Sequence, residues 1–139
     1  MIPAFHSLRT MKTILTITGS DSTGESGVQA DIRTISALGV KAVSVITSVT
    51  IQNTIGIKAS FDLPAFVVSG QLDAIINDVQ PEVVKMGMVR NSDVLAVIVD
   101  SLRRYRPAAV VYDPILFSSR GDRLMGSDAI EQVRRQLFQ

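Results

Sequence analysis

The sequence predicts an α/β protein built on a mainly parallel sheet, and three observations carry this prediction. Short apolar runs rich in β-branched residues alternate along the chain with segments of helical periodicity. A glycine-rich loop within GSDSTGESGVQAD, residues 19–31, joins the first apolar run to the first helix. Small or polar residues follow each of four predicted strands, at the sheet edge where open parallel sheets bind ligands.

The first strand is predicted at residues 13–18 and the first helix at about 26–38. Gly24 and Gly27 let the loop between them turn sharply and approach a small molecule. One face of the helix carries four apolar side chains: Val28, Ile32, Ile35 and Leu38. Asp31 falls within that face, so its carboxylate needs a partner, either a ligand or the backbone amides of an ordinary turn. Three polar residues are expected to point away: Gln29, Arg33 and Ser36.

The remaining elements continue the alternation. Further strands are predicted at residues 42–49, 83–86 and 109–112, and residues 42–53 and 56–61 form two adjacent strands, either a hairpin or a flap. Helices are predicted at about 64–79, at 92–104 and after a cap at Ser127. Their apolar stripes are Val68, Leu72, Ile75, Ile76 and Val79, then Leu95, Ile98, Val99 and Leu102, then Ile130, Val133 and Leu137. Gly70 inside the second helix indicates close packing.

Composition narrows the function. The chain has 139 residues, 46% of them hydrophobic, which suits one folded domain. Lys plus Arg number 14 against 13 Asp plus Glu, so no net field favours nucleic acid or an anionic membrane. The absence of Cys excludes disulfides, zinc-thiolate sites and thiol nucleophiles and is typical of a cytoplasmic protein. The single histidine, His6, makes histidine-based metal sites and triads unexpected, and we predict no metal site of the protein's own.

The front of the chain is predicted to be an extension. Residues 1–12 lack the apolar core and cleavage site of a signal peptide, and Met11 is an alternative start. His6 is then a solvated tail residue, and the folded part begins at residue 13. No apolar run reaches the about 18 residues that a membrane span needs.

Four predicted strand ends point to a pocket at one rim of the sheet. The residues that follow the strands are Gly19-Ser20-Asp21, Gln52-Asn53, Gly87-Met88 and Asp113-Pro114. Taken by themselves, Gln52 and Asn53 indicate a polar β-turn. Met86 and Met88 alternate along one strand, so one is expected in the core and the other, Met88, at the rim.

The motifs resemble those of the hydroxymethylpyrimidine/phosphomethylpyrimidine kinases of thiamine biosynthesis, which are ribokinase-like. The resemblance covers about residues 14–138 and is carried by ILTITGSDSTGESGVQADIRTISALG, VITSVTIQNT, VVKMGMV and VVYDPILFSSRGDRLM. It implies a three-layer α/β/α fold, truncated here, and ATP-dependent phosphorylation of 4-amino-5-hydroxymethyl-2-methylpyrimidine and then of its monophosphate, with Mg²⁺. By resemblance, the residues that hold the pyrimidine are Gly19, Asp31, Gln52, Met88 and Ile115, and Asp113 lies near the phosphates and magnesium.

The chain also departs from the family pattern. Family members usually read GGAG where this chain has Gly24-Glu25-Ser26-Gly27, so a carboxylate enters the loop. The family's lysine after the DP pair is Ser119 here, beside Arg120. The family is also about twice as long, and its second half carries the anion-hole loop, the activating carboxylate and most of the adenine site. No catalytic residue is therefore assigned to this chain.

Residues 13–139 are interpreted as the N-terminal half of such a kinase domain, and three functions remain open. The first is a kinase that is active only with a complementing C-terminal half, the isolated chain being expected to transfer phosphate at a negligible rate. The second is a non-catalytic pyrimidine-binding or regulatory module. The third, another nucleotide-binding α/β domain, is weakest because GxGxxG and GxxxxGK[ST] are absent. We expect a small-molecule pyrimidine partner, and either a homo-oligomer or a complementing half to cover the exposed sheet edge.

Overall fold

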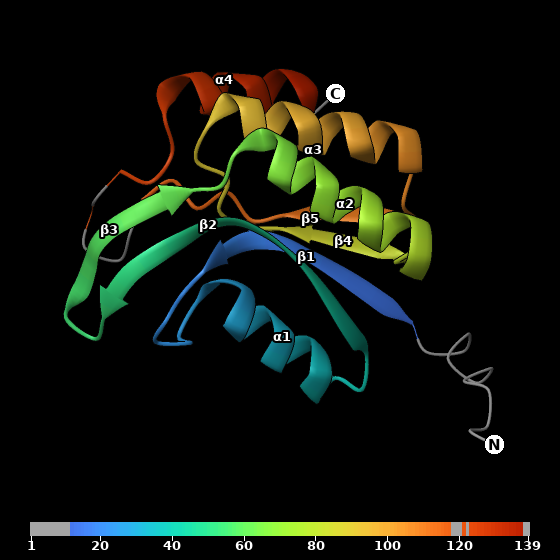
Figure 1. The fold of residues 1–139 in the computed structure, drawn as a ribbon, viewed down its shortest axis with the longest axis horizontal. Coiled ribbons are helices and arrows are strands. Elements are labelled where there is room, and N and C mark those ends of the chain that lie inside the picture. Colours follow the sequence, from blue (N-terminus) through green and yellow to red (C-terminus); the bar gives the residue numbers. More distant parts are fainter. Residues whose placement is uncertain (1–11, 118–120, 122, 138–139) are drawn as a thin grey trace.

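The structure, a computed structural model, describes residues 12–117, 121 and 123–137. Its centre is a five-stranded sheet with the strand order β3-β2-β1-β4-β5, in which β3 is antiparallel and the other strands are parallel. Helix α1 lies on one face of the sheet and α2, α3 and α4 lie on the other (Figure 1). The predicted three-layer α/β fold is confirmed. The elements are β1 (Thr13–Ser20), α1 (Gly27–Ala37), β2 (Lys41–Asn53), β3 (Gly56–Asp62), α2 (Ala65–Val79), β4 (Val83–Met86), α3 (Ser92–Tyr105), β5 (Ala109–Tyr112) and α4 (Ser127–Gln136).

Strand β1 is the middle of the sheet and is buried on both faces. Leu15 and Ile17 have no exposed surface, and Thr16 and Thr18 on the opposite face are also fully buried. Burial on both faces explains why the sequence of β1 is almost continuously apolar or β-branched. The strand thus fixes the position of the loop that leaves its carboxyl end.

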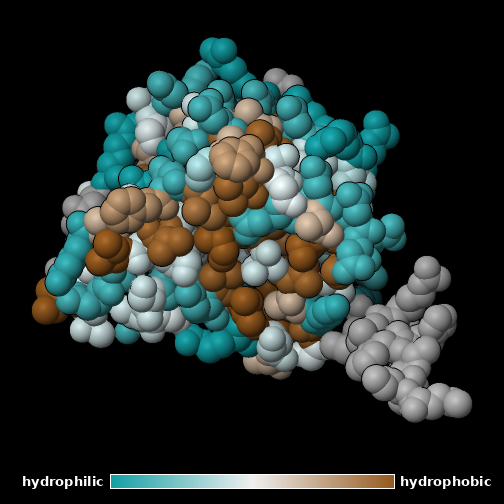
Figure 2. Space-filling model, in the orientation of Figure 1, coloured by the Kyte–Doolittle hydropathy of each residue, from teal (hydrophilic) through white to brown (hydrophobic). Residues whose placement is uncertain are grey.

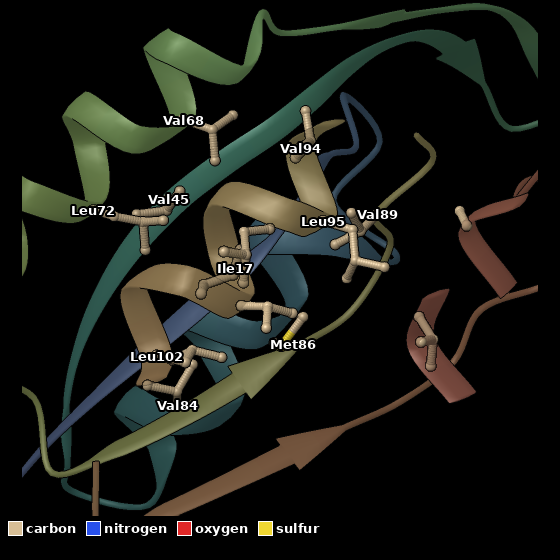
Figure 3. Close-up of a cluster of buried hydrophobic side chains, with 14 of the residues drawn as sticks. Ile17, Val45, Val68, Leu72, Val84, Met86, Val89, Val94, Leu95 and Leu102 are labelled. Atoms are coloured by element: carbon tan, nitrogen blue, oxygen red, sulfur yellow. The ribbon is translucent and has the colours of Figure 1, made fainter. Parts of the chain in front are cut away.

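The main core lies between the sheet and the helices on one face. In Figure 3 the side chain of Val84 from β4 lies beside Leu102 from α3, and Met86 and Leu95 belong to the same buried cluster. The predicted apolar face of α3 is confirmed, because Leu95, Ile98, Val99 and Leu102 are all buried. None of the helices among the described residues has the length and apolar character that a membrane crossing requires.

Strands β2 and β3 form the predicted hairpin. The side-chain oxygen Oδ1 of Asn53 accepts hydrogen bonds from the backbone N–H of Ile55 (3.0 Å) and of Gly56 (3.3 Å) and so closes the turn. Gln52 is still part of β2 and pairs with Ile57. The turn therefore belongs to Asn53, and Gln52 projects from β2, which ends at residue 53 as the prediction of adjacent strands at 42–53 and 56–61 expected.

Helix α1 differs in detail from its predicted pattern. Val28 and Ile35 are buried as expected, but Ile32 is 37% exposed and Leu38 is 73% exposed. The reason is that α1 is alone on its face of the sheet in the described part of the chain, so its flank has no neighbour. The expectation that Gln29 points away is wrong, because its side chain binds the loop before the helix.

Two other local predictions are corrected. Gly70 is exposed, and a Cβ added there would meet no atom within 4 Å, so it does not mark close packing. Ser127 is not the cap of α4: Gly126 holds that position in an extended conformation, and Ser127 is the first helical residue. Ile130 N–H donates to the Gly126 carbonyl, which places the first helical turn one residue earlier than expected.

Strand β5 forms one edge of the sheet among the described residues. It pairs with β4 on one side, and Val110 and Val111 are 42% and 56% exposed. An apolar strand edge is thus present, as expected for a sheet that continues elsewhere or meets a partner. His6, Met11, Ser119 and Arg120 lie outside the described residues.

Candidate functional site

A cavity of about 390 Å³ opens at the carboxyl ends of the parallel strands. Each of the four predicted strand ends, or the segment following it, contributes to the wall, as predicted for the carboxyl edge of a parallel sheet. The lining residues are Thr18, Gly19, Ser20, Asp21, Glu25, Ser26, Gly27, Thr50, Gln52, Asn53, Thr54, Gly56, Ile57, Met88, Ile115, Phe117 and Leu124. Its volume is that of a small-molecule site.

Two glycines give the loop after β1 its shape. Gly27 has φ of +60°, and a Cβ there would lie 2.4 Å from the Gly19 carbonyl oxygen. A Cβ on Gly19 would lie 2.5 Å from Cε of Met88 and 2.8 Å from Oγ of Ser48. Gly27 therefore requires glycine, both for its backbone angle and because the clash is with backbone. A side chain at Gly19 would have to displace the side chains of Met88 and Ser48. The loop between β1 and α1 can therefore pack closely and form part of the cavity wall.

Asp21, which the sequence placed among the residues that follow the first strand but gave no role of its own, organises that loop. Its Oδ1 accepts from the backbone N–H and the hydroxyl of Thr23, and its Oδ2 accepts from the same two groups of Ser26, all at 2.8 Å. Burial by itself would raise the pKa of this carboxyl, but the hydrogen bonds from Ser26 and Thr23 outweigh burial and lower the pKa. Asp21 is therefore an anion. An Asp two residues before a Thr in a glycine-rich turn is the signal that could have revealed it.

Gln52 presents its amide at the cavity wall. Its Oε1 lies 2.8 Å from the Thr50 hydroxyl, which also lies 2.9 Å from the Ser20 carbonyl. Its Nε2 lies 3.5 Å from the Thr23 hydroxyl, which is the weak end of the hydrogen-bond range. One end of the amide is thus anchored, and the Nε2 end can turn to a ligand.

Met88 and Ile115 supply apolar wall. The backbone of Met88 is held at both ends, because its N–H donates to the Thr18 hydroxyl (3.1 Å) and its carbonyl accepts from the Thr47 hydroxyl (2.8 Å). Met88 is 8% exposed, while Met86 is fully buried in the core. The predicted division between a core methionine and a rim methionine is confirmed. Ile115 is half-buried in the segment after β5.

Asp31 lies outside the lining of the cavity. Lys85 Nζ donates to both of its carboxylate oxygens, at 2.9 and 3.0 Å, and the Thr16 hydroxyl donates at 2.5 Å. The expectation that this core-facing carboxylate has a partner is confirmed, and the partner is a lysine on β4. Lys85 could have been noticed as a cation inside an apolar strand. The substrate contact that the resemblance implies for Asp31 stays a prediction.

Asp113 also stands apart from the lining. It is exposed just after β5, where its backbone N–H donates to the Met86 carbonyl (2.9 Å). The described residues contain no group of three His, Asp or Glu side chains able to hold a metal ion. The assignment of Asp113 to a phosphate and magnesium neighbourhood therefore stays a prediction.

The fold belongs to the ribokinase-like class, which solved kinase structures share. The crystal structure of phosphomethylpyrimidine kinase from Clostridium difficile 630 superposes with a TM-score of 0.85 and 40% identity, over 91% of this chain and 55% of that one. A pyridoxal kinase from Bacillus subtilis, solved with ADP, gives a TM-score of 0.79 and 25% identity over 92% and 47%.

The family follows from the sequence comparison. The family model described as phosphomethylpyrimidine kinase matches residues 21–139, so the chain belongs to that family. The hydroxymethylpyrimidine/phosphomethylpyrimidine kinase of Rhizobium meliloti is 46% identical over 124 residues, which are 89% of this chain and 46% of the relative. The enzyme of the same name from Mycobacterium tuberculosis H37Rv is 40% identical over 90% of this chain and 46% of its own length. The chain thus spans about half the length of these curated relatives.

Proposed function

We propose that the cavity binds 4-amino-5-hydroxymethyl-2-methylpyrimidine, and that the chain supplies the substrate-binding half of an ATP-dependent kinase of thiamine biosynthesis. One observation carries the proposal. Four of the five residues assigned to the pyrimidine by resemblance line a single cavity: Gly19, Gln52, Met88 and Ile115.

The chemistry of the wall suits an aminopyrimidine. Such a ring presents nitrogen acceptors beside an amino donor, and a glutamine amide has one donor end and one acceptor end. Gln52 can therefore pair with both groups once its Nε2 leaves the weak contact with Thr23. The thioether of Met88 and the side chain of Ile115 supply a polarisable and an apolar surface for the ring.

The described residues of the cavity fit the pyrimidine better than they fit ATP. The kinase family implies ATP as co-substrate, yet the described lining contains Asp21 and Glu25 and no Lys, Arg or His. Carboxylates without cations do not suit a triphosphate. No phosphoryl-transfer step is therefore assigned to these residues. The proposal keeps three predictions from the sequence: that Mg²⁺ is bound with Asp113 in its neighbourhood, that the protein is cytoplasmic, and that the chain forms a homo-oligomer or pairs with a complementing C-terminal half.

Calorimetric titration with the pyrimidine tests the binding. Gln52→Ala should weaken the affinity by about 1–3 kcal/mol, because a buried polar group of the ligand loses its partner. Gln136→Ala, a matched change at the end of α4 and away from the cavity, should leave the affinity unchanged. Equal affinities for the wild type and Gln52→Ala would remove Gln52 from the site.

A second candidate is a pyrimidine-binding or regulatory module without catalysis. The observation that favours it is the cation-free described lining of the cavity, which offers nothing to neutralise a transferring phosphoryl group. Both candidates predict negligible turnover of the isolated 139-residue chain in an ATP-coupled assay. A rate within about tenfold of the roughly 1–100 per second of typical kinases would contradict both. A reading frame that continues downstream of codon 139 into a G-T-G-C or G-A-G-C segment would favour the kinase half.

A further inference from the structure

Strand β2 carries a buried hydroxyl whose hydrogen-bonding capacity is unused. Ser48 has no exposed surface, and its Oγ forms no hydrogen bond within the described part of the chain. Such a group is unfavourable in a folded protein unless something else satisfies it. Four neighbouring buried hydroxyls on β1 and β2 each have a partner: Thr16, Thr18, Thr47 and Thr50. The Ser48 hydroxyl is therefore available to a group from outside the chain.

The position of Ser48 in β2 places its side chain on the cavity face of the strand. Successive side chains alternate between the two faces of a strand, so Ser48 shares a face with Thr50 and Gln52. Thr50 and Gln52 line the cavity. Val49 and Ile51 alternate with them and are exposed on the opposite face. Ser48 is thus the inner member of a polar row that runs along the cavity side of β2.

Ser48 lies directly behind the part of the cavity wall that Gly19 and Met88 form. A Cβ added to Gly19 would lie 2.8 Å from Ser48 Oγ and 2.5 Å from Met88 Cε, so the hydroxyl and the thioether methyl meet at one point beside Gly19. Hydrogen bonds from Met88 N–H and to its carbonyl hold the backbone of Met88. Its unbranched side chain remains flexible. A ring that packs against Met88 and turns the methyl group aside therefore reaches the Ser48 hydroxyl.

The proposed substrate presents an acceptor that suits this hydroxyl. An aminopyrimidine has two ring nitrogens, and the Gln52 amide can pair with the one beside the amino group and with the amino group itself. The second ring nitrogen needs a donor of its own once it is buried. We propose that Ser48 is a specificity-determining residue whose hydroxyl donates to this second ring nitrogen and so distinguishes the pyrimidine from the corresponding pyridine. The inference rests on the proposed function, since it concerns the same site.

Calorimetric titration of the 139-residue chain with two ligands tests the inference. The ligands are the pyrimidine and 2-amino-3-hydroxymethyl-6-methylpyridine, which keeps the ring nitrogen beside the amino group and has CH in place of the other. At a pH where both rings are neutral, the wild type should bind the pyrimidine about three- to tenfold more tightly, as expected for one neutral hydrogen bond. Ser48→Ala should weaken pyrimidine binding by about the same factor and change pyridine binding less than about twofold.

Thermal unfolding separates substrate binding from a structural role. Because Ser48 Oγ has no partner within the described chain, Ser48→Ala should leave the Tm of the ligand-free protein unchanged or higher. Ser101→Ala is the matched control. Ser101 is a buried serine of α3 whose hydroxyl accepts from Arg104 at 3.3 Å, and it lies outside the cavity lining. Its replacement should change neither affinity.

The outcomes separate this inference from the proposed function. If the wild type binds both ligands equally, or if Ser48→Ala keeps full pyrimidine affinity, the inference is wrong while pyrimidine binding stands. A lower Tm with an equal loss of affinity for both ligands would also overturn it, since Ser48 would then act only through packing of the wall. If the wild type binds neither ligand, the proposed function fails and the inference fails with it. The wild-type comparison needs no variant, so it decides the question even if Ser48→Ala does not fold.

Discussion

Replacing Asp31 by alanine should destabilise the fold and leave the cavity in place. In the structure the Asp31 carboxylate accepts two contacts from Lys85, at 2.9 and 3.0 Å, and one from Thr16, at 2.5 Å. The carboxylate joins α1 to β1 and β4 across the sheet. Asp31→Ala removes all three contacts and leaves the Lys85 ammonium without its partner.

The size of the effect follows from the contacts and their exposure. Hydrogen bonds to charged groups contribute about 1.5–3 kcal/mol each when buried. The side chains of Lys85 and Asp31 are 24% and 18% exposed, so water screens part of this energy. We expect a loss of about 2 kcal/mol of unfolding free energy in total. For a chain of 139 residues an unfolding entropy of about 2.1 cal/mol/K per residue converts this loss into about 7 °C of Tm.

The assay is a double-mutant cycle read by thermal and urea unfolding, together with pyrimidine titration. The variants are Asp31→Ala, Lys85→Met and the pair. Because Met fills the space of the Lys85 stem without its charge, the double variant should lose less than the sum of the single losses, with a coupling of about 1 kcal/mol. Asp100→Ala, an exposed aspartate of α3, should stay within about 0.5 kcal/mol of the wild type.

Two results would refute this reasoning. Additive single losses would show that Asp31 and Lys85 do not interact energetically. Full stability of Asp31→Ala combined with lost pyrimidine affinity would show that Asp31 is a substrate contact, as the resemblance implies, and not part of the framework. Reduced stability with retained affinity would place Asp31 in the framework alone.

Further predictions concern the loop after β1. Gly27→Ala should lower the free energy of unfolding by at least about 2 kcal/mol, because its Cβ would lie 2.4 Å from the Gly19 carbonyl oxygen. Gly70→Ala, in open space within α2, should instead raise the free energy of unfolding by up to about 1 kcal/mol. Comparable urea midpoints for the two variants would contradict the loop geometry. Asp21 has a folded-state pKa below its ordinary value of 3.8. Its contribution to the free energy of unfolding is therefore present above pH 3.8 and is lost as the pH falls through the lowered folded pKa. Urea unfolding between about pH 5 and pH 2 should therefore show a smaller acid-induced loss in Asp21→Asn than in the wild type, and parallel pH curves would refute the assignment.

Several apolar side chains remain exposed on the hairpin formed by β2 and β3. Figure 2 shows apolar side chains gathered over β2 and the hairpin. Val49, Ile51 and Phe61 are 43%, 52% and 60% exposed there. With the open edge of β5, these surfaces agree with a chain that spans about half the length of its relatives.

The sequence by itself determined the order and kind of the elements and the place of the site. Alternation of apolar runs with helical periodicity is a local property, so it predicted β1, β4 and β5 and the apolar face of α3 almost to the residue. The carboxyl ends of parallel strands meet at one edge, so the residues after each strand already indicated the cavity that Gly19, Gln52 and Met88 line.

Only the tertiary structure decided which residues meet. Lys85 lies 54 positions after Asp31, and no local pattern links two such distant side chains. The exposure of Ile32 and the engagement of Gln29 depend on what stands beside α1, which helical periodicity does not encode. Periodicity specifies the face of an element that can be buried, but the neighbours that bury it, and the charges they bring, exist only when the chain is folded.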